Sequence, residues 1–386
     1  MKLTKTILAS LALCATTIAH AEVEWSGFGS LYYTQAFDSK FLPARSKSNK
    51  MDFTAASSLG LNMATRLSNE LTASAQFIAS GSNAQTENFN MFAQWAYLQY
   101  RMDNNVSFKL GRQLWPILIA SEYQRVHHLL PSASIPGTAY VVLPFVSFDG
   151  ASANYSHDLG FAKLTVGAYV GTPKLNLTPP AALNLEFQNL VGARVGLDGS
   201  GWKVHGTINH YYGKVAITIP TTGTTAIGAP GVVGTTFRAE THNVAKSFGI
   251  KFDKYNVVAL LEGTHLHNTD TSIFGLTSKQ LFETSHSAYA LLGYRVGKFL
   301  PYLSAAQGYV KYGLPYDSTT LSRYEGRVTS YILGTAYHYN EQASIKLEYQ
   351  RDTVPAVDGG FYASYIAQGY TKKYGDMISL GVDFIF

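Results

Sequence analysis

The chain ends in Ile378-Ser379-Leu380-Gly381-Val382-Asp383-Phe384-Ile385-Phe386, where an apolar residue stands at every even position. This alternation predicts a β-strand with one apolar face and one face that is free to be polar. An apolar strand at the end of a chain is an exposed, aggregation-prone edge unless another strand pairs with it. We therefore expect this strand to pair with the first strand of the chain and to close a barrel.

The beginning of the chain has the pattern of a secretory signal peptide. Lys2 and Lys5 precede an apolar stretch over residues 7–18, and Ala19-His20-Ala21 has the form of a cleavage site. The sequence thus predicts a signal peptide over residues 1–21 and a single barrel domain over residues 22–386.

The one cysteine, Cys14, lies within that predicted signal peptide. The rest of the chain therefore has no residue for a disulfide or a catalytic thiol. Leu11-Ala12-Leu13-Cys14 also allows a lipoprotein signal, but Leu13 is bulky for the position before the cysteine.

The composition differs from that of an ordinary soluble domain. Charged residues make up 14% of the chain, against about a quarter in soluble proteins, while 26 residues are Tyr, 21 are Phe and 34 are Gly. Outside the predicted signal peptide, no apolar run reaches the roughly 18 to 20 residues of a membrane helix. The apolar residues instead alternate with polar ones, as in a transmembrane barrel. Without Lys2 and Lys5 the net charge falls from +5 to about +3, which is too small to indicate a nucleic-acid partner.

Alternating segments of roughly ten residues recur along the chain, which is the length of a tilted strand that crosses a membrane. We predict sixteen strands, over residues 23–35, 53–67, 70–81, 89–102, 105–112, 145–157, 160–171, 187–198, 201–213, 243–254, 256–268, 284–297, 299–312, 326–339, 342–352 and 375–386. Short turns alternate with long connections such as 113–144 and 214–242. This predicts an all-β antiparallel barrel with short periplasmic turns and long extracellular loops.

The parity of the strands predicts which charged side chains point into the lumen. Where Val191 and Val195 face lipid, Arg194 faces inward, and the same phase holds on the other strands. The predicted lumen residues are Arg66, Lys109, Lys163, Arg194, Lys203, Lys251, Glu262, Arg295, Lys346, Glu348 and Asp383. Two interpretations stay open: these charges solvate a water-filled wall, or their basic surplus favours anions.

The connection after the fifth predicted strand is long and too apolar to be disordered. It contains Leu114-Trp115-Pro116 and the run Ile117 to Ala120, which need a surface to pack on. We expect this third extracellular loop to fold inward and narrow the pore. The candidate constriction residues are Arg112, Glu122, Tyr123, Arg125, His127 and His128. The alternative is a loop that caps the rim or packs at a subunit contact.

The chain resembles the Gram-negative general porins of the sixteen-stranded, trimeric class. The resemblance rests on Gly27-Phe28-Gly29, on Lys109-Leu110-Gly111-Arg112-Gln113 followed by Pro116, on the loop pattern and on the terminal Phe386. It implies a homotrimer in the outer membrane of a Gram-negative bacterium, in contact with lipid and lipopolysaccharide, and an assembly machinery that reads Phe386. The third loop lacks the acidic Pro-Glu-Phe-Gly-Gly tip of the enteric porins, so their cation preference is not carried over.

Three classes of function follow from these patterns. We expect a passive channel for small hydrophilic solutes and ions, with no enzymatic activity and no cofactor. The first alternative is a substrate-selective porin for sugars, carboxylates or phosphate, in which Tyr123 or Tyr140 and Arg112 or Arg194 form a saturable path. The second is an outer-membrane enzyme, for which no Ser-His pair with a fixed partner is evident.

Two histidine motifs raise the question of a metal. His127-His128 and His265-Leu266-His267 have no cysteine or carboxylate cluster at ligand spacing. We therefore expect no metal site.

Overall fold

The computed structural model describes residues 22–37, 51–54, 56–81, 89, 91–140, 143, 145–174, 183–218, 236–273, 276–277, 282–315, 321–354 and 373–386. The predicted signal peptide and parts of the predicted long connections lie outside these residues.

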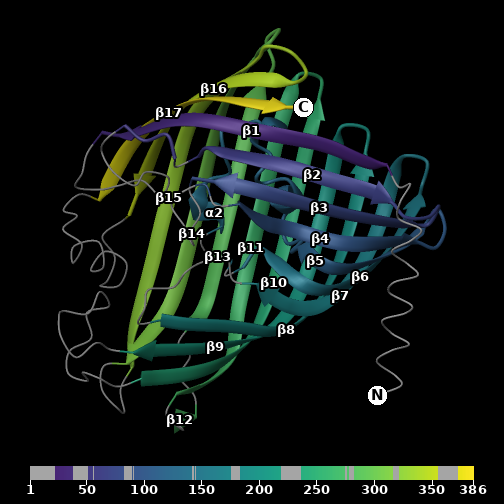
Figure 1. Ribbon diagram of the computed structural model, residues 1–386. Coiled ribbons are helices and arrows are strands. Elements are labelled where there is room, and N and C mark those ends of the chain that lie inside the picture. The colour runs from purple at the N-terminus through teal and green to yellow at the C-terminus, as the bar shows by residue number, and fades with distance from the viewer. Residues whose placement is uncertain are drawn as a thin grey trace, which may run out of the picture.

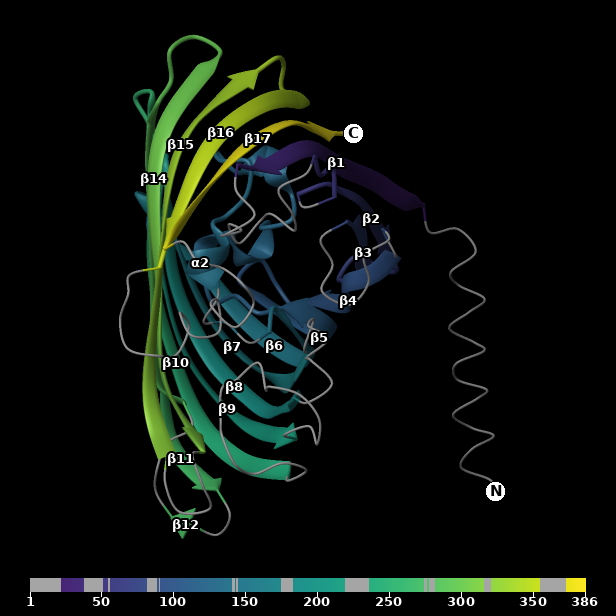
Figure 2. The ribbon, with the colours of Figure 1, turned by 90° about the vertical axis from the view of Figure 1, so that its left-hand side faces the viewer.

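The described strands form one antiparallel sheet that closes on itself (Figures 1 and 2). Its seventeen strands are β1 (Val23–Ala36), β2 (Ser58–Arg66), β3 (Leu71–Ser80), β4 (Met91–Arg101), β5 (Val106–Leu114), β6 (Ser147–Asp158), β7 (Ala162–Lys174), β8 (Leu183–Gly199), β9 (Trp202–Thr218), β10 (Thr236–Lys254), β11 (Val257–Ile273), β12 (Leu276–Thr277), β13 (Phe282–Tyr294), β14 (Phe299–Pro315), β15 (Leu321–His338), β16 (Ala343–Thr353) and β17 (Tyr374–Ile385). The two-residue β12 pairs with β11, which also pairs with β13. The wall is therefore the predicted sixteen-stranded barrel.

The last strand closes the barrel against the first, as its alternation predicts. Register pairs run from Phe28 with Ile385 to Ala36 with Met377. At the end of the chain, Gly27 and Phe386 exchange backbone hydrogen bonds of 2.8 and 2.9 Å. The apolar edge of the terminal strand is thus fully paired.

Alternation continues into the packing inside the barrel. Leu380, Val382 and Phe384 are exposed on the outer face. Asp383, which stands between Val382 and Phe384 in the sequence, is buried on the inner face. Gly381 lies beside the buried ring of Tyr32, and a Cβ atom on Gly381 would stand 2.2 Å from a ring carbon. Glycine is required here because Tyr32 fills the space that a side chain would occupy.

The strands from β8 to β11 and from β14 to β15 are longer than predicted. β10 has 19 residues and β15 has 18, against nine in β2. In β8 the added residues Leu183-Asn184-Leu185-Glu186 alternate, but a register shift between Gln188 and Val191 reverses the phase, so Phe187 packs inside while Val191 is exposed outside. Backbone pairing continues across this shift, as in Glu186 with Lys214. One side of the barrel is consequently taller than the other (Figure 2).

Three short helices lie in the segment between β5 and β6: η2 (Ile119–Glu122), η3 (His127–Leu129) and α2 (Gly137–Tyr140). We call residues 115–146 the third loop. None of the described helices is long and apolar enough to cross a membrane.

The third loop packs on side chains of the inner face of the wall. One cluster joins Trp115, Ile117 and Leu118 of the loop to the wall residues Tyr169 and Tyr211. A second cluster joins Ile119 and Ala139 to the wall residues Leu260, Tyr289, Leu300, Tyr302 and Ile332. The apolar residues that need a surface to pack on therefore find it inside the barrel.

Candidate functional site in the barrel lumen

Charged wall residues hold the third loop through its backbone. Lys346 Nζ donates to the carbonyl oxygens of His127, Leu130 and Ser132 at 2.7, 2.8 and 3.1 Å. The same ammonium lies 2.9 Å from Asp383 Oδ2 in an ion pair whose side chains are fully buried. Asp383 also accepts a hydrogen bond of 2.7 Å from Tyr32. A buried charge needs this degree of pairing, so the ammonium fixes the loop around η3 to the wall.

Two glutamates also anchor the loop. Lys346 donates to its carbonyl groups, whereas the glutamates accept hydrogen bonds from its N–H groups. Glu262 Oε1 accepts from Ile119 at 2.5 Å and from Ala120 at 3.3 Å, at the start of η2. Glu348 Oε1 accepts from Ala133 at 2.8 Å and from the Tyr302 hydroxyl at 2.6 Å. Orphan N–H groups of the loop are thus satisfied by carboxylates of β11 and β16.

Neutral side chains add further anchors along the loop. Trp115 Nε1 donates to Asn209 at 2.9 Å, and His205 Nε2 lies 2.9 Å from the carbonyl oxygen of Pro116. Ser287 donates to the carbonyl oxygen of Ala139 at 2.6 Å. These contacts come from β9 and β13, so four neighbouring parts of the wall, β9, β11, β13 and β16, hold the loop.

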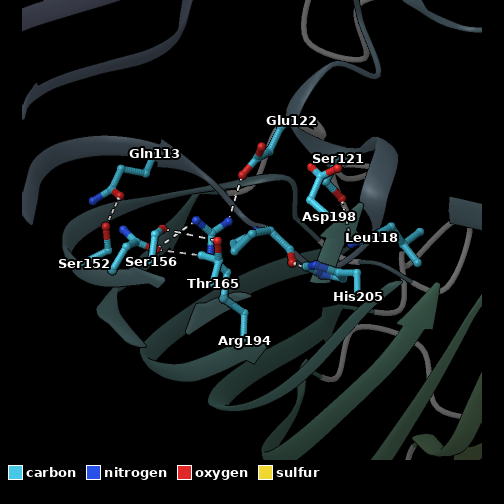
Figure 3. A network of polar contacts seen from close by, with 12 residues as sticks. Gln113, Leu118, Ser121, Glu122, Ser152, Ser156, Thr165, Arg194, Asp198 and His205 are labelled. Atoms are coloured by element: carbon cyan, nitrogen blue, oxygen red, sulfur yellow. Dashed lines mark hydrogen bonds and ion pairs between the residues drawn. The ribbon is translucent and has the colours of Figure 1, made fainter. Parts of the chain in front are cut away.

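The opposite edge of the loop carries a carboxylate that meets a basic wall. Arg194 Nη1 of β8 donates to Glu122 Oε1 at 2.8 Å, and Figure 3 shows the two side chains reaching toward each other. Burial alone raises the pKa of Glu122, but Arg194, Lys109 and Lys203 outweigh it and hold this pKa below its ordinary value. Glu122 is therefore ionised among three cations.

Two adjoining pockets meet at this ion pair. The first encloses about 170 Å³ and is lined by Trp95, Tyr97, Lys109, Gln113, Leu114, Pro116, Glu122, Phe148, Ser152, Asn154, Tyr169 and Arg194. The second encloses about 110 Å³ and is lined by Pro116, Leu118, Ile119, Glu122, Thr165, Arg194, Gly196, Asp198, Lys203 and His205. In the second pocket Lys203 lies 3.6 Å from Asp198. Open space in the lumen thus lies between the third loop and strands β4 to β9.

The first pocket has an aromatic wall beside its charges. The rings of Trp95 and Tyr97 stack with centroids 5.1 Å apart, and Lys109 Nζ lies 4.5 Å from the Tyr97 centroid. Gln113 accepts a hydrogen bond of 2.6 Å from Ser152, and Asn154 accepts from Arg194 (Figure 3 draws the Gln113 contact). Flat rings, cations and amides therefore face one cavity.

The other predicted constriction residues lie at different depths. Tyr123 is half-buried with Lys251 Nζ 5.6 Å from its ring centroid, and burial raises the pKa of Tyr123. Burial lowers the pKa of Arg125. His127 is buried, with its ring 5.9 Å from that of Tyr32. His128 Nε2 lies 3.0 Å from the carbonyl oxygen of Glu341, so the two histidines contact the wall on the anchored side of the loop.

Arg112 does not lie with this group. It forms an ion pair of 2.8 Å with Asp149, which also lies 3.2 Å from Lys174. In the pairing of β5 with β6, Arg112 is opposite Asp149, whereas the next pair, Gln113 with Phe148, faces inward. The side chain therefore points outward, and its assignment to the constriction is corrected; the prediction followed the sequence motif rather than the parity of the strand.

The predicted lumen residues divide into three groups. Glu262, Lys346, Glu348 and Asp383 point inward but are at most 2% exposed, because the third loop covers them. They are anchors of the loop and do not line open pore. Lys109, Arg194 and Lys203 border the two pockets, and Lys251 contacts Tyr123.

The three remaining lumen residues lie toward the rim with the short turns. Arg295 pairs in a bidentate manner with Asp253, with one contact of 2.9 Å. Lys163 is opposite Asp198 in the pairing of β7 with β8, and Arg66 is exposed at the end of β2. None of the three contacts Glu122 within the described residues.

Sequence reasoning missed Trp95, Gln113, Ser152 and Asn154 as lining residues. Their strand parity was available, since Trp95 and Tyr97 share a face. Which inward residues remain uncovered, however, depends on the path of the third loop, and strand parity does not give that path.

Searches with family models and against curated proteins find no match. Solved structures do match. A loop L8 deletion mutant of OmpT, an outer membrane protein of Vibrio cholerae, aligns with a TM-score of 0.59 and 14% identity over 95% of this chain and 99% of that chain. The outer membrane channel DcaP of Acinetobacter baumannii aligns with a TM-score of 0.58 and 12% identity over 95% and 98% of the chains.

A third match is the anion-selective porin from Comamonas acidovorans, with a TM-score of 0.54 and 10% identity over 95% of this chain and all of that chain. A structure of the Vibrio cholerae OmpT described as a trimer form aligns with a TM-score of 0.53 and 13% identity over 95% and 99% of the chains. At these identities the similarity establishes the fold. The chain has the sixteen-stranded barrel fold of the porins of the Gram-negative outer membrane.

Proposed function

We propose that this protein is a porin, a passive water-filled channel for small hydrophilic solutes and ions that favours anions weakly. The observation that carries the proposal is the basic wall opposite Glu122. Lys109, Arg194 and Lys203 all act on this one carboxylate of the loop. Fixed cations that outnumber carboxylates at a narrow passage lower the barrier for anions and raise it for cations.

The third loop is the part of the channel that sets its width. Because the loop is anchored on β9, β11, β13 and β16, it occupies that side of the lumen. Solutes then pass beside the ion pair of Glu122 with Arg194, through the space that residues of β4 to β9 line. Passive diffusion of solutes involves no covalent chemistry, so the proposed function is not enzymatic.

Reconstitution into a planar bilayer tests this function. A voltage-independent conductance and a reversal potential of the anion-selective sign in a salt gradient are expected. A reversal potential of the opposite sign contradicts the preference for anions, and the absence of any conductance contradicts the channel.

A substrate-selective channel is the second candidate, and the first pocket favours it. The stacked Trp95 and Tyr97 rings and the cations Lys109 and Arg194 suit a solute with a flat apolar face and a negative charge. Conductance that saturates and is blocked by such a solute distinguishes this candidate from simple diffusion.

The proposed biological unit is a homotrimer in the outer membrane. The outer faces of β2 to β4 carry small side chains, including Ala73, Ala75 and Ala96, around a shallow groove of about 380 Å³ that suits close packing of another copy. Removal of the signal peptide 1–21 and reading of Phe386 by the assembly machinery belong to the same proposal. Mass measurement of the detergent-solubilised protein tests the trimer.

A further inference from the structure

A row of basic and aromatic side chains crosses five neighbouring strands. Its members are Lys246 of β10, His265 of β11, His286 of β13, Tyr309 of β14 and Arg327 of β15, which we call the outer row. Each is the register partner of the next. The row therefore follows the direction of the interstrand hydrogen bonds and spans four interstrand spacings, about 19 Å.

The outer row faces away from the lumen. The residues next to it in sequence point inward: Ser247 donates to the carbonyl oxygen of Ile117, and Ser287 donates to that of Ala139. Ser330 of β15 contacts Thr138 at 3.0 Å, and Arg327 has the opposite parity. Since successive side chains of a strand alternate, the row lies on the outer surface of the barrel.

The members of the row are stacked. The rings of His265 and His286 have centroids 5.6 Å apart and an interplanar angle of 8°. His286 and Tyr309 stack at 4.7 Å and 9°, and the guanidinium of Arg327 lies 5.9 Å from the Tyr309 centroid. Among the described residues, no carboxylate forms an ion pair with Lys246 or Arg327. The row thus ends in two cations without a protein counter-ion in that part of the chain.

The height of the row on the barrel indicates its surroundings. His265 stands eight residues from Val257, the first residue of β11, which corresponds to about 20 Å along the barrel axis. The outer face between the row and the short turns is apolar, with exposed Phe248, Leu261 and Leu292. An apolar band is about 25 Å tall in such barrels. The row therefore lies at the boundary of the band on the side of the long loops.

A cation at this boundary is not penalised as it is in the middle of the membrane. There an outward Lys or Arg costs about 2 to 4 kcal/mol, against about 0 to 1 kcal/mol near the interface. Lys and Arg at the interface are also placed to meet charged head groups, and both bind phosphate well. Imidazole rings between them add hydrogen-bond donors.

We propose that the outer row binds phosphate groups of the glycolipid head groups in the outer leaflet, of the lipid A type. Charge complementarity decides this occupant, because two imidazoles and two cations that have no ion-pair partner among the described residues face the layer in which those phosphates lie. A row of about 19 Å has room for two phosphate groups, one at Lys246 and one at Arg327. The inference rests on the proposed outer-membrane location but not on the conduction of solutes.

Binding of purified lipid to the full-length protein in detergent tests the proposal. Native mass spectrometry is used with bis-phosphorylated lipid A and with the same lipid after removal of both phosphates. We expect the phosphorylated form to bind at least tenfold more tightly, and the Lys246→Gln/Arg327→Gln variant to lose this preference. Lys298→Gln is the matched control, since Lys298 lies at the rim of the short turns, where it donates to the carbonyl oxygen of Tyr339 at 2.9 Å.

Equal binding of the two lipids by the unaltered protein overturns the proposal, as does an unchanged preference in the double variant. The single variants Lys246→Gln and Arg327→Gln, and the His265→Gln/His286→Gln pair, give the same readout if the double variant does not fold. A change in oligomer mass would make the row a contact between copies and would also overturn it. Conductance of the unaltered protein is measured separately, so failure of the channel is distinguished from failure of lipid binding.

Discussion

Arg194 of the wall binds Glu122 of the third loop, while its other nitrogens are tied to a neighbouring wall residue. Nη1 donates to Glu122 at 2.8 Å, and Nη2 and Nε donate to Asn154 Oδ1 at 2.8 and 3.2 Å. The guanidinium is thereby fixed in orientation, with its positive charge between two pockets. Ion selectivity should therefore respond to either member of this pair.

Removal of the carboxylate should strengthen the preference for anions. In Glu122→Gln, the cations Lys109, Arg194 and Lys203 lose their common counter-charge, so we expect the ratio of anion to cation permeability to rise about two- to threefold. Reversal potentials in a tenfold salt gradient measure this ratio. Glu70→Gln is the matched control, because Glu70 lies in an exposed turn.

Arg194→Gln should move the same ratio in the opposite direction. If both Glu122→Gln and Arg194→Gln leave the reversal potential unchanged, the passage does not run past this ion pair.

The pH dependence of selectivity follows from the depressed pKa of Glu122. Because its pKa lies below the ordinary value of about 4.3, this carboxylate stays ionised from neutral pH to below that value. Its ion pair with Arg194 is then fully present above the ordinary pKa and is lost as the pH falls through the depressed one. We expect the difference in reversal potential between the unaltered protein and Glu122→Gln to be constant from neutral pH down to the ordinary pKa of a glutamate and to vanish only below it. A difference that vanishes near pH 6 would contradict this assignment.

Loss of the buried ammonium should release the third loop. Lys346→Met leaves Asp383 buried without its cation and removes three hydrogen bonds from the loop, at a cost of about 3 to 5 kcal/mol. We expect a lower unfolding temperature, measured as the temperature at which the barrel changes its mobility in an SDS gel. We also expect larger fluctuations of the single-channel current.

The double variant Lys346→Met/Asp383→Asn is the control for the uncompensated charge. It should recover part of the unfolding temperature while keeping the large current fluctuations, since the loop still lacks its donor. Full recovery of both properties would show that the loop does not depend on Lys346.

Trp95→Ala tests the aromatic wall of the first pocket. If an aromatic anion such as benzoate binds there, the loss of stacking should weaken its block of the conductance by about five- to tenfold. The current carried by chloride should change far less, because chloride has no ring that could stack on Trp95. Tyr212→Ala, which changes an exposed ring on the outer face of β9, serves as control. Equal block by benzoate in Trp95→Ala would favour simple diffusion.

Gly381→Ala should destabilise the closing strand through overpacking. The new methyl group would stand 2.2 Å from the Tyr32 ring, which is itself buried and donates to Asp383. A cost of about 1 to 3 kcal/mol is expected, seen as a lower unfolding temperature. Gly206→Ala is the matched control, because its nearest contact would be 3.7 Å and we expect almost no change.

Alternation alone was enough to predict the barrel, because lipid on one side and a polar interior on the other impose a period of two on every wall strand. The pairing of Phe28 with Ile385 confirms the closure that the last nine residues predict. Strand ends were less predictable. The start of β8 was missed because the register shift between Gln188 and Val191 reverses the phase of its alternation, although pairing continues to Glu186 with Lys214.

Strand alternation also predicts that the side chains of Lys346 and Glu262 point inward, but it does not predict that they anchor the third loop. Both point inward, and only the path of the third loop decides that they are covered rather than exposed. That path depends on contacts between residues far apart in sequence, such as the hydrogen bonds from Lys346 to the segment around η3. The prediction for Arg112 was wrong for a different reason. It followed the Gly111-Arg112-Gln113 motif, whereas the alternation of β5 directs this side chain outward.

Anchoring the third loop from one side leaves the barrel with two halves that can change independently. Substitutions on β11, β13 and β16 must preserve Glu262, Ser287, Lys346 and Glu348 together, because each holds backbone of the same segment. Among the described residues, the lining side chains Trp95, Lys109 and Ser152 of β4 to β6 form no hydrogen bond with the backbone of this segment. Single substitutions of these side chains should therefore change the solute preference while the third loop keeps its position.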